Sequence, residues 1–396
     1  MGSKQEESWG KRDRCWRRWG RFLRDVGLCD PYLDSVSAEG RRLLAKCFLV
    51  VYRSGKFDKQ GQHVGKRKTP VVAATVRDAI SHVATAFRAG DQPSPFHHEG
   101  NATGNGPIRR ELKELLQAFE NHDPPPDRQK AVSPKLLEDM SQLAKRLSLV
   151  HEHAADLIVG AFFFAMRGCE FCLSKRTEVG RTKLLELGDI TFRDEDKVVI
   201  PKSTVDLEER AYYVTVRFVF QKNNEKNDRR TQGRSGRAIC PVRAWARACR
   251  RVITTGRDVT SRTRVCRVGD GKGTHTDITS DRVVRLLRLT CRRYGKRQGY
   301  GTEEHELGTR SIRSGAAMSL FLLNHSTDRI MILGRWKSKA FMVYIRPQVL
   351  EWTNIMAEDM ARAGDFRDLN RKRQPCLTNK SSNWDDGLMP EFHLTH

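Results

Sequence analysis

Apolar and polar positions recur with a helical period through the first 121 residues of the chain. Between residues 8 and 26, tryptophans and other apolar residues are spaced three and four apart among arginines, the pattern of an amphipathic helix with a basic outer face. The same period predicts helices over residues 37–53, 70–89 and 107–121, where Pro70 and Pro107 suit a first helical turn. We therefore expect an all-helical first domain over residues 1–121.

A proline-rich segment follows this helical region. Residues 122–130, HDPPPDRQK, combine three consecutive prolines with charge, which prevents a helix and favours an extended spacer. We place a linker at residues 122–132 and a second domain at residues 133–363. From residue 364 the sequence is polar and aperiodic, so residues 364–396 are expected to form a C-terminal tail.

The second domain begins with two helical patterns. Ser133 and Pro134 suit the cap and the first turn of a helix that runs to about Leu147. Residues 153–172 are mostly apolar and predict one long, buried helix.

The period then changes to one typical of strands. Residues 197–200 and 212–220 are rich in β-branched and aromatic residues, and residues 221–231 are expected to form a polar turn beyond them. Helical patterns return over residues 241–253 and 280–294. The expected fold class is mainly α-helical with a small antiparallel β-sheet, an α+β second domain.

Charge indicates the kind of partner. Lys plus Arg number 72 against 48 for Asp plus Glu, a formal net charge of +24, which favours a polyanion. Arginine supplies much of the excess, and its forked donors favour nucleic acid over a membrane surface. Twelve arginines against one acid lie between Arg229 and Arg267, and we expect this run to contact phosphates.

The sequence also bears on the location of the protein in the cell and on the redox state of its cysteines. The first residues carry no apolar run typical of a secretory signal, and the longest apolar stretch, Leu157 to Met166, is about half the roughly 20 residues needed to cross a bilayer. We expect an intracellular protein with reduced cysteines and no membrane partner.

Two arginine motifs far apart in the sequence carry the candidate chemistry. Arg167 follows the apolar run GAFFFAM, and Glu170 lies three residues later. Arg313 precedes the small residues Ser-Gly-Ala-Ala, a Gly-Arg-Trp box occupies residues 334–336, and Tyr344 lies eight residues beyond its tryptophan. Two forked cations and a tyrosine suit attack of a phenolate on a phosphodiester, because negative charge builds on the nonbridging oxygens and no metal is needed.

These motifs resemble the catalytic half of the tyrosine recombinase and integrase family, from Lys135 to about Arg362. The resemblance implies that Tyr344 is the nucleophile and forms a 3′-phosphotyrosyl link with DNA. It implies that Arg167 and Arg313 hold the phosphate, that Trp336 packs against it, and that Glu170 orients Arg167.

The resemblance also implies a catalytic lysine in a β-hairpin turn, which would protonate the departing 5′ oxygen. Lys222, just after VRFVFQ, is the best match, and Lys226 is the alternative. Further DNA contacts are expected from four residues, namely Lys226, Arg229, Arg230 and Arg335.

One position departs from the family pattern. Histidine usually stands three residues before the second arginine, and here that residue is Arg310, which donates hydrogen bonds but accepts none. Type IB topoisomerases resemble this arrangement with lysine at that position, and His305 lies five residues earlier. Three functions stay open: a site-specific recombinase, a catalytically silent DNA-binding relative, and a topoisomerase-like enzyme that relaxes DNA as a monomer.

The partners implied by the resemblance are double-stranded DNA and further copies of the chain. The helical first domain and the catalytic domain would clamp a duplex, and a homo-tetramer would assemble on two DNA sites. A helical pattern over residues 348–363 is the candidate for docking on a neighbouring protomer. No small-molecule cofactor is implied, and a mobile genetic element is the implied origin.

Overall fold

The structure is a computed structural model of the whole chain. It describes residues 2–57, 70–98, 106–124, 129–174, 182–221, 226–269, 274–342 and 345. Four of the sequence expectations lie outside the described residues, and these concern Lys222, Tyr344, the helix over residues 348–363 and the tail over residues 364–396.

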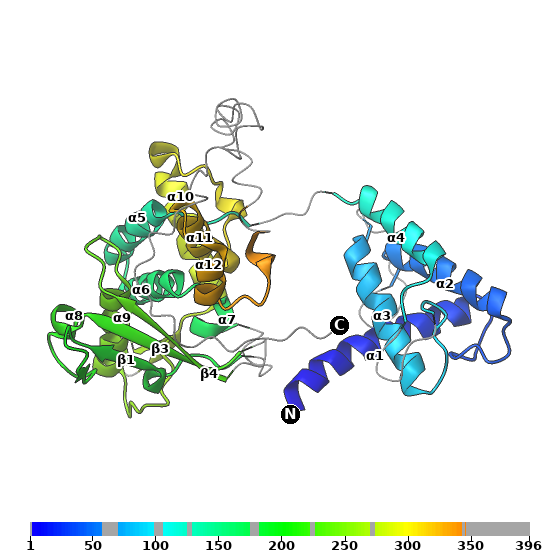
Figure 1. Cartoon of the computed structure of the whole chain (residues 1–396), viewed down its shortest axis with the longest axis horizontal. Coiled ribbons are helices and arrows are strands. Elements are labelled where there is room, and N and C mark those ends of the chain that lie inside the picture. The colour runs from blue at the N-terminus through cyan, green and yellow to red at the C-terminus, as the bar shows by residue number, and fades with distance from the viewer. Residues whose placement is uncertain are drawn as a thin grey trace, which may run out of the picture. The chain divides into compact units, whose positions relative to one another are not determined.

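The N-terminal part has its own apolar core, which the described helices α1 to α4 surround (Figure 1). Their bounds are α1 Gly2–Asp25, α2 Ala38–Arg53, α3 Ala73–Ala89 and α4 Arg110–Asn121. Trp19 has no exposed surface, and its ring meets those of Phe48 and Phe96 edge-on at 5.1 and 5.4 Å. The periodic apolar positions are therefore the ones that build this core.

The starts of α3 and α4 differ from the prediction. Pro70 and Pro107 precede their helices instead of opening them. The backbone N–H of Arg109 donates to Phe96 at 3.1 Å and the carbonyl of Pro107 accepts from His98 at 3.0 Å, so this segment is held extended until α4 begins. Local propensity favoured an earlier start, and a backbone pairing with a distant segment overrides it.

A second apolar core underlies the rest of the described chain. Its helices are α5 Pro134–Lys145, α6 Leu149–Phe163, α7 Gly168–Phe171, α8 Leu207–Arg210, α9 Pro241–Thr255, α10 Ser280–Gln298, α11 Thr309–Leu322 and α12 Thr327–Gly334, with 3₁₀ turns η1 Leu187–Asp189, η2 Glu304–Glu306 and η3 Lys339–Phe341. Its strands are β1 Ile190–Arg193, β2 Val199–Ile200, β3 Tyr213–Phe220, β4 Lys226–Gly233, β5 Arg267–Gly269 and β6 His275–Asp277. The chain is thus mainly helical with a small antiparallel sheet, as predicted.

The main sheet corrects one expectation. Its order is β2-β1-β3-β4, and β4 pairs with β3 from Tyr213 opposite Gly233 to Phe220 opposite Lys226. The polar turn expected over residues 221–231 is therefore mostly a strand. β4 escaped prediction because it is a polar edge strand, held by backbone hydrogen bonds to β3, without the alternation of apolar residues that marks a half-buried strand.

The long helix expected over residues 153–172 is broken. Helix α6 ends at Phe163, and Ala165 takes a left-handed conformation with φ +44°. The N–H of Met166 donates to Ala161 at 2.9 Å and that of Ala165 to Phe162 at 3.0 Å, the hydrogen bonds of a Schellman end with alanine where glycine is usual. This turn brings Arg167 to the start of α7, instead of the end of a buried helix.

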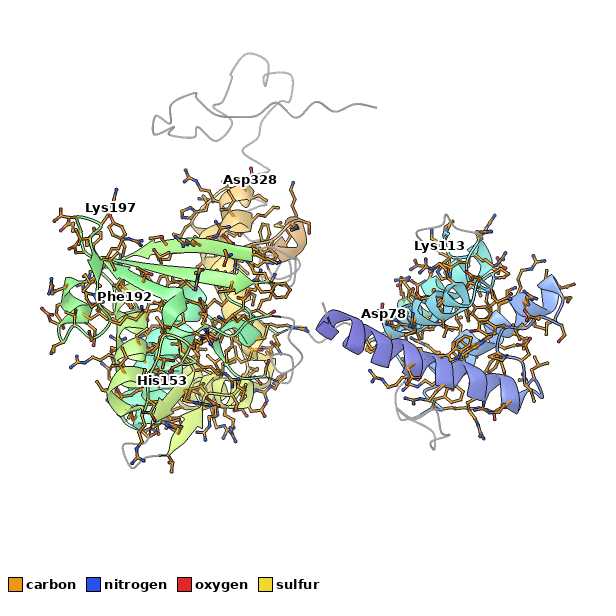
Figure 2. All side chains as sticks on the ribbon, turned by 90° about the horizontal axis from the view of Figure 1, so that it is seen from below. Asp78, Lys113, His153, Phe192, Lys197 and Asp328 are labelled. Carbon is orange, nitrogen blue, oxygen red and sulfur yellow. The ribbon has the colours of Figure 1, made fainter. Side chains whose placement is uncertain are left out.

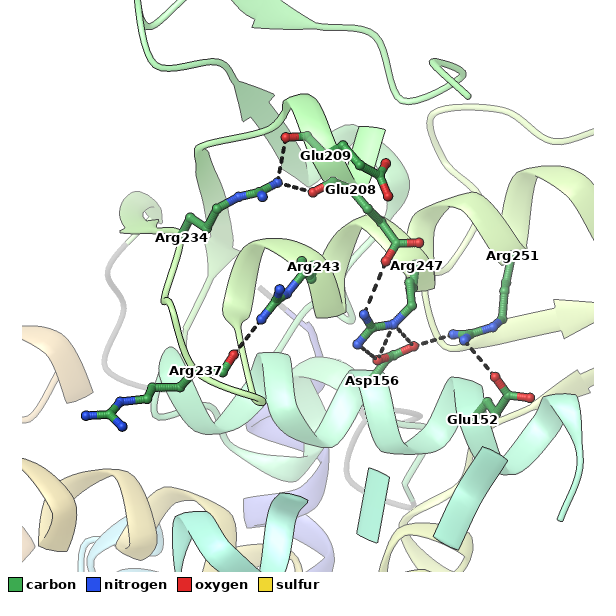
Figure 3. A network of polar contacts seen from close by, with 9 residues as sticks. All are labelled: Glu152, Asp156, Glu208, Glu209, Arg234, Arg237, Arg243, Arg247 and Arg251. Carbon is green, nitrogen blue, oxygen red and sulfur yellow. Dashed lines mark hydrogen bonds and ion pairs between the residues drawn. The ribbon is translucent and has the colours of Figure 1, made fainter. Parts of the chain in front are cut away.

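Ion pairs centred on the buried Asp156 tie α6 to α9 (Figure 3). The Asp156 carboxylate accepts from Arg247 at 2.5 and 3.0 Å and from Arg251, which also reaches Glu152 at 3.3 Å. Arg247 continues to Glu208 at 3.2 Å. Part of the arginine run that we expected to contact phosphates is therefore bound by the protein's own carboxylates.

The interior of this part also holds a histidine. His153 has no exposed surface, and its Nε2 lies 2.9 Å from the carbonyl of Val265. Figure 2 shows His153 and Phe192 within the body of this part, and Lys197 and Asp328 at its periphery. In the described part of the chain, no helix is both long and apolar enough to cross a membrane.

Candidate active site

The turn between α6 and α7 builds one side of the site. Arg167 precedes α7, and its backbone N–H donates to Glu170 Oε2 at 2.8 Å. Its guanidinium donates to Oε1 of the same carboxylate at 3.0 Å. Glu170 is 1% exposed, whereas the Arg167 side chain keeps 24% of its surface in contact with solvent. Glu170 thus orients Arg167 and leaves part of its fork accessible.

Helix α11 supplies the second arginine. Arg313 is buried, and its Nη1 donates to the carbonyl of Ala165 at 2.8 Å across 148 positions of sequence. Its Nη2 donates to the carbonyl of Gly334. The left-handed conformation of Ala165 therefore sets the direction of a carbonyl that holds Arg313 beside the Arg167 turn.

Arg335 contributes a third guanidinium from the end of α12. Its Nη2 donates to Glu170 Oε2 at 2.9 Å, and the Arg335 side chain has no exposed surface. Its Cζ lies 3.6 Å from the ring centroid of Phe218 on β3. The sequence led us to expect a DNA contact at Arg335, and the structure places its guanidinium in the interior against Glu170.

The electrostatic surroundings of Glu170 keep its carboxyl group ionised. Burial alone would raise the pKa of the Glu170 carboxyl, but the charges of Arg335, Arg167 and Arg313 outweigh it and lower that pKa below its usual range. An ionised carboxylate therefore faces three guanidinium groups among the described residues. The exposed edge of Arg167 is a place where these forked donors can bind an anion.

The Gly-Arg-Trp box shapes the contact with Arg313. The Trp336 ring lies under that guanidinium, with Cζ 4.2 Å from the ring centroid, and it meets Phe341 at 5.5 Å. A Cβ at Gly334 would lie 1.6 Å from the Trp336 ring, so glycine is required there. Trp336 therefore supports Arg313, and Phe341, which packs on it, is three residues before Tyr344, outside the described residues.

Arg310 lies one helical turn before Arg313 on α11, and its side chain is exposed. Its backbone N–H donates to Gln129 Oε1 at 3.1 Å. A Cβ atom added at Gly168 would lie 3.1 Å from the Thr309 side chain, so the starts of α7 and α11 adjoin. Arg310 is thus an exposed cation at the start of α11, which adjoins the start of α7, while His305 lies in η2 with an exposed side chain.

The β3–β4 hairpin presents the remaining basic residues. Lys226 and Arg229 are exposed on β4, whereas Arg230 is half-buried and pairs with Asp228 at 3.2 Å. Gln221, buried at the end of β3, donates to the same Asp228 at 3.2 Å. Residues 222–225, which include Lys222, connect β3 to β4 in the sequence and lie outside the described residues.

Metal-ligating side chains do not cluster in the part of the chain that the structure describes. No group of three or more His, Cys, Asp and Glu there has a geometry that could hold a metal ion.

Sequence reasoning missed the groups that assemble the site. Ala165 and Phe218 were assigned to an apolar helix and to a strand, and neither carries a chemical group that marks it. A left-handed φ at a non-glycine residue and a guanidinium stacked on a distant ring leave no periodic pattern in a sequence.

Comparisons with known proteins find similarity in solved structures alone. No model of a known protein family matches the sequence, and no curated protein matches it. The Tn1549 transposon integrase in complex with circular intermediate DNA is similar over 79% of this chain and 81% of its own, with 11% identity and a TM-score of 0.39. The site-specific recombinase XerH bound to its difH substrate is similar over 80% and 70%, with 12% identity and a TM-score of 0.40. Overlaps this low assign no activity, so the function must be inferred from the side chains.

Proposed function

We propose that the protein cuts and rejoins DNA as a site-specific tyrosine recombinase. One observation carries the proposal: Arg167 and Arg313, from motifs far apart in the sequence, lie around the same buried carboxylate, and Arg167 keeps an exposed edge. A phosphodiester suits this edge, because the forked donors of arginine match its oxygens.

The proposed reaction is a transesterification. The Tyr344 oxygen forms a bond to phosphorus while the bond from phosphorus to the 5′ oxygen breaks, and Arg167 and Arg313 stabilise the charge on the nonbridging oxygens. A lysine of the hairpin, Lys222 or else Lys226, gives its proton to the 5′ oxygen. The phenolic proton goes to solvent or to a group other than Arg310, which has no acceptor atom. A 5′ hydroxyl of a second strand reverses the step, so no cofactor is consumed.

The larger assembly is part of the same proposal. The helical region over residues 1–121 and the catalytic region over residues 133–363 act as two domains that clamp a duplex, joined by the linker at residues 122–132. Lys226 and Arg229, both exposed on β4, are the DNA contacts that the structure supports best. Two DNA sites and four chains form the recombining complex, with the segment over residues 348–363 as the docking element.

A suicide-substrate assay tests this function. Nicked duplexes with a randomised centre lose a short fragment after cleavage, which traps any covalent protein–DNA adduct for detection on a denaturing gel and for sequencing. We expect an adduct with the wild-type chain and none with Tyr344→Phe, while both bind the duplex pool equally in a gel-shift assay.

The same assay separates the rival functions. Binding by the wild-type chain without an adduct would support the silent DNA-binding relative and contradict the enzyme. An adduct accompanied by relaxation of supercoiled plasmid, but without strand exchange between two captured sites, would instead support the topoisomerase-like enzyme.

A further inference from the structure

We infer that Arg335 is a positioning residue that fixes the β3–β4 hairpin, and with it the proton donor, against the Arg167 turn. This inference rests on the proposed function. It assigns Arg335 a role inside the protein instead of a contact with DNA.

Burial excludes Arg335 from the DNA surface. Its side chain has no exposed surface, and Glu170 Oε2 and Oε1 lie 2.9 and 3.4 Å from its Nη2 and Nη1. Nη2 also lies 3.4 Å from the carbonyl of Ala165, which accepts from Arg313. A contact with phosphate would require breaking a buried ion pair, which is far more costly than breaking an exposed one.

The other face of the Arg335 guanidinium lies against the hairpin. Phe218 is buried on β3, and its ring centroid is 3.6 Å from Arg335 Cζ, a cation–π contact in a desolvated place. Phe218 pairs across the strands with Asp228, and Asp228 accepts from Gln221 at the end of β3. Phe218 and Asp228 therefore link Arg335 to Gln221, the residue before Lys222 in the sequence.

Arg335 adopts a backbone conformation that is energetically unfavourable for an arginine. It follows the last residue of α12 with φ +58° and ψ +44°, the left-handed conformation that glycine or asparagine adopts most easily at a helix end. An arginine at this position is explained by its contacts to Glu170 and Phe218, which glycine would not make.

Three segments of the proposed reaction meet at this guanidinium. Glu170 holds the Arg167 turn, Phe218 belongs to the hairpin, and Arg335 itself stands nine residues before Tyr344 in the sequence. Loss of Arg335 is thus expected to displace the hairpin and to impair delivery of the proton more than binding of the phosphate.

Substrates with a bridging sulfur distinguish these two effects. When sulfur replaces the 5′ bridging oxygen, the leaving thiolate needs no proton, because a thiol is a much stronger acid than an alcohol. Single-turnover adduct formation would be measured on oxygen and sulfur versions of a captured nicked duplex, with Arg335→Gln, Arg335→Lys and Phe218→Leu. Phe192→Leu is the matched control, since Phe192 is a buried phenylalanine of the same sheet.

We expect Arg335→Gln to slow cleavage of the oxygen substrate by about 10-fold to 100-fold, part of what a general acid contributes, and to cleave the sulfur substrate within about 3-fold of wild type. Arg335→Lys and Phe218→Leu should show the same selective defect in weaker form, and Phe192→Leu should show none. The two weaker variants keep the test decisive if Arg335→Gln does not fold.

Other outcomes overturn the inference. Equal slowing on both substrates would assign Arg335 to phosphate binding or to general stability, and unchanged cleavage of both would remove any role. If the wild-type chain forms no adduct with either substrate, the proposed function itself fails, a result distinct from a defect confined to the variants.

Discussion

Glu170 is the residue on which the three guanidinium groups of the site converge. Its carboxylate is fully buried and binds Arg167 at 3.0 Å and Arg335 at 2.9 Å. A buried ion pair adds little net stability relative to an apolar pair, but removal of one partner leaves the other charge buried without compensation. Removal of the Glu170 carboxylate is therefore expected to cost more stability than its ion pairs contribute.

Glu170→Gln should lower the free energy of unfolding by about 3–5 kcal/mol, because Arg335 would keep its charge in the interior without a carboxylate. Urea unfolding at neutral pH measures the loss. Glu304→Gln is the control, since its pair with Arg292, at 2.7 Å, has side chains that are 40% and 68% exposed and should change stability by less than about 1 kcal/mol. Equal effects of the two substitutions would contradict the role given to Glu170.

The burial of His153 makes the free energy of unfolding depend on pH. Burial lowers the pKa of His153 to about 4, whereas in the unfolded chain it titrates near 6.5. Between these values the unfolded state binds a proton that the folded state does not, so stability falls as the pH drops from about 6.5 to about 4. The shift corresponds to a loss of about 3 kcal/mol below pH 4.

His153→Gln should remove that component of the acid dependence. The comparison is between the pH profiles of unfolding free energy for the two chains from pH 7.5 to pH 4. Parallel profiles would show that His153 does not contribute.

At the scale of elements, α6 is held at its middle and at its C-terminal end by different forces. The Asp156 network joins it to α9, and the turn at Ala165 joins its end to α11 through Arg313 (Figure 3 shows the network). Gly160 allows α9 to come close, since an added Cβ would lie 2.5 Å from the Trp245 ring. The position of Arg167 thus depends on how α6 packs against α9, through contacts that do not involve the residues of the site.

Asp156→Asn should destabilise the fold by about 3 kcal/mol, because the half-buried Arg247 and the largely buried Arg251 would lose their shared carboxylate. Asp13→Asn removes an exposed pair with Arg17 by the same chemical change, and a loss of less than about 1 kcal/mol is expected. Thermal unfolding of both variants measures the difference. A matching shift in the two would mean that the network does not hold α6 to α9.

Gly334→Ala tests the end of α12. The added methyl group would occupy the place of the Trp336 ring, so the ring must leave the Arg313 guanidinium. We expect adduct formation on the suicide substrate to fall by at least about 10-fold, a typical cost when positioning of a catalytic group is lost. Gly236→Ala, at a site with open space around the added Cβ, should leave the rate unchanged.

At the scale of the whole molecule, net charge and its placement govern DNA binding. The formal charge of +24 favours a polyanion, yet Arg247 and Arg251 are neutralised internally and Arg335 is buried. The number of phosphates that the protein neutralises is therefore smaller than the arginine count of the sequence suggests.

Affinity for duplex DNA should decrease steeply with salt. If roughly six to ten phosphates are contacted, the binding constant is expected to fall by about 10³-fold to 10⁵-fold between 50 and 200 mM salt. Fluorescence anisotropy with a labelled duplex measures the slope. A binding constant nearly independent of salt would contradict binding through phosphates.

The sequence by itself determined the features that local patterns encode. Helical periodicity located α2, α5 and α9 to within two residues of their ends, and a run rich in β-branched and aromatic residues located β3. Arg167 and Glu170 are three residues apart at a helix start and are therefore neighbours, and their side chains form an ion pair at 3.0 Å.

The tertiary structure alone decided what depends on residues distant in sequence. Strand β4 exists because β3 offers backbone partners, and α6 ends at Ala165 in a left-handed turn whose carbonyl then binds Arg313 and Arg335. The sequence predicted that Arg335 is a surface residue, but its side chain is buried. Contacts with Glu170 and Phe218 together compensate the cost of burying its charge. Such compensation is a property of three-dimensional neighbours, and no period or composition in the sequence records it.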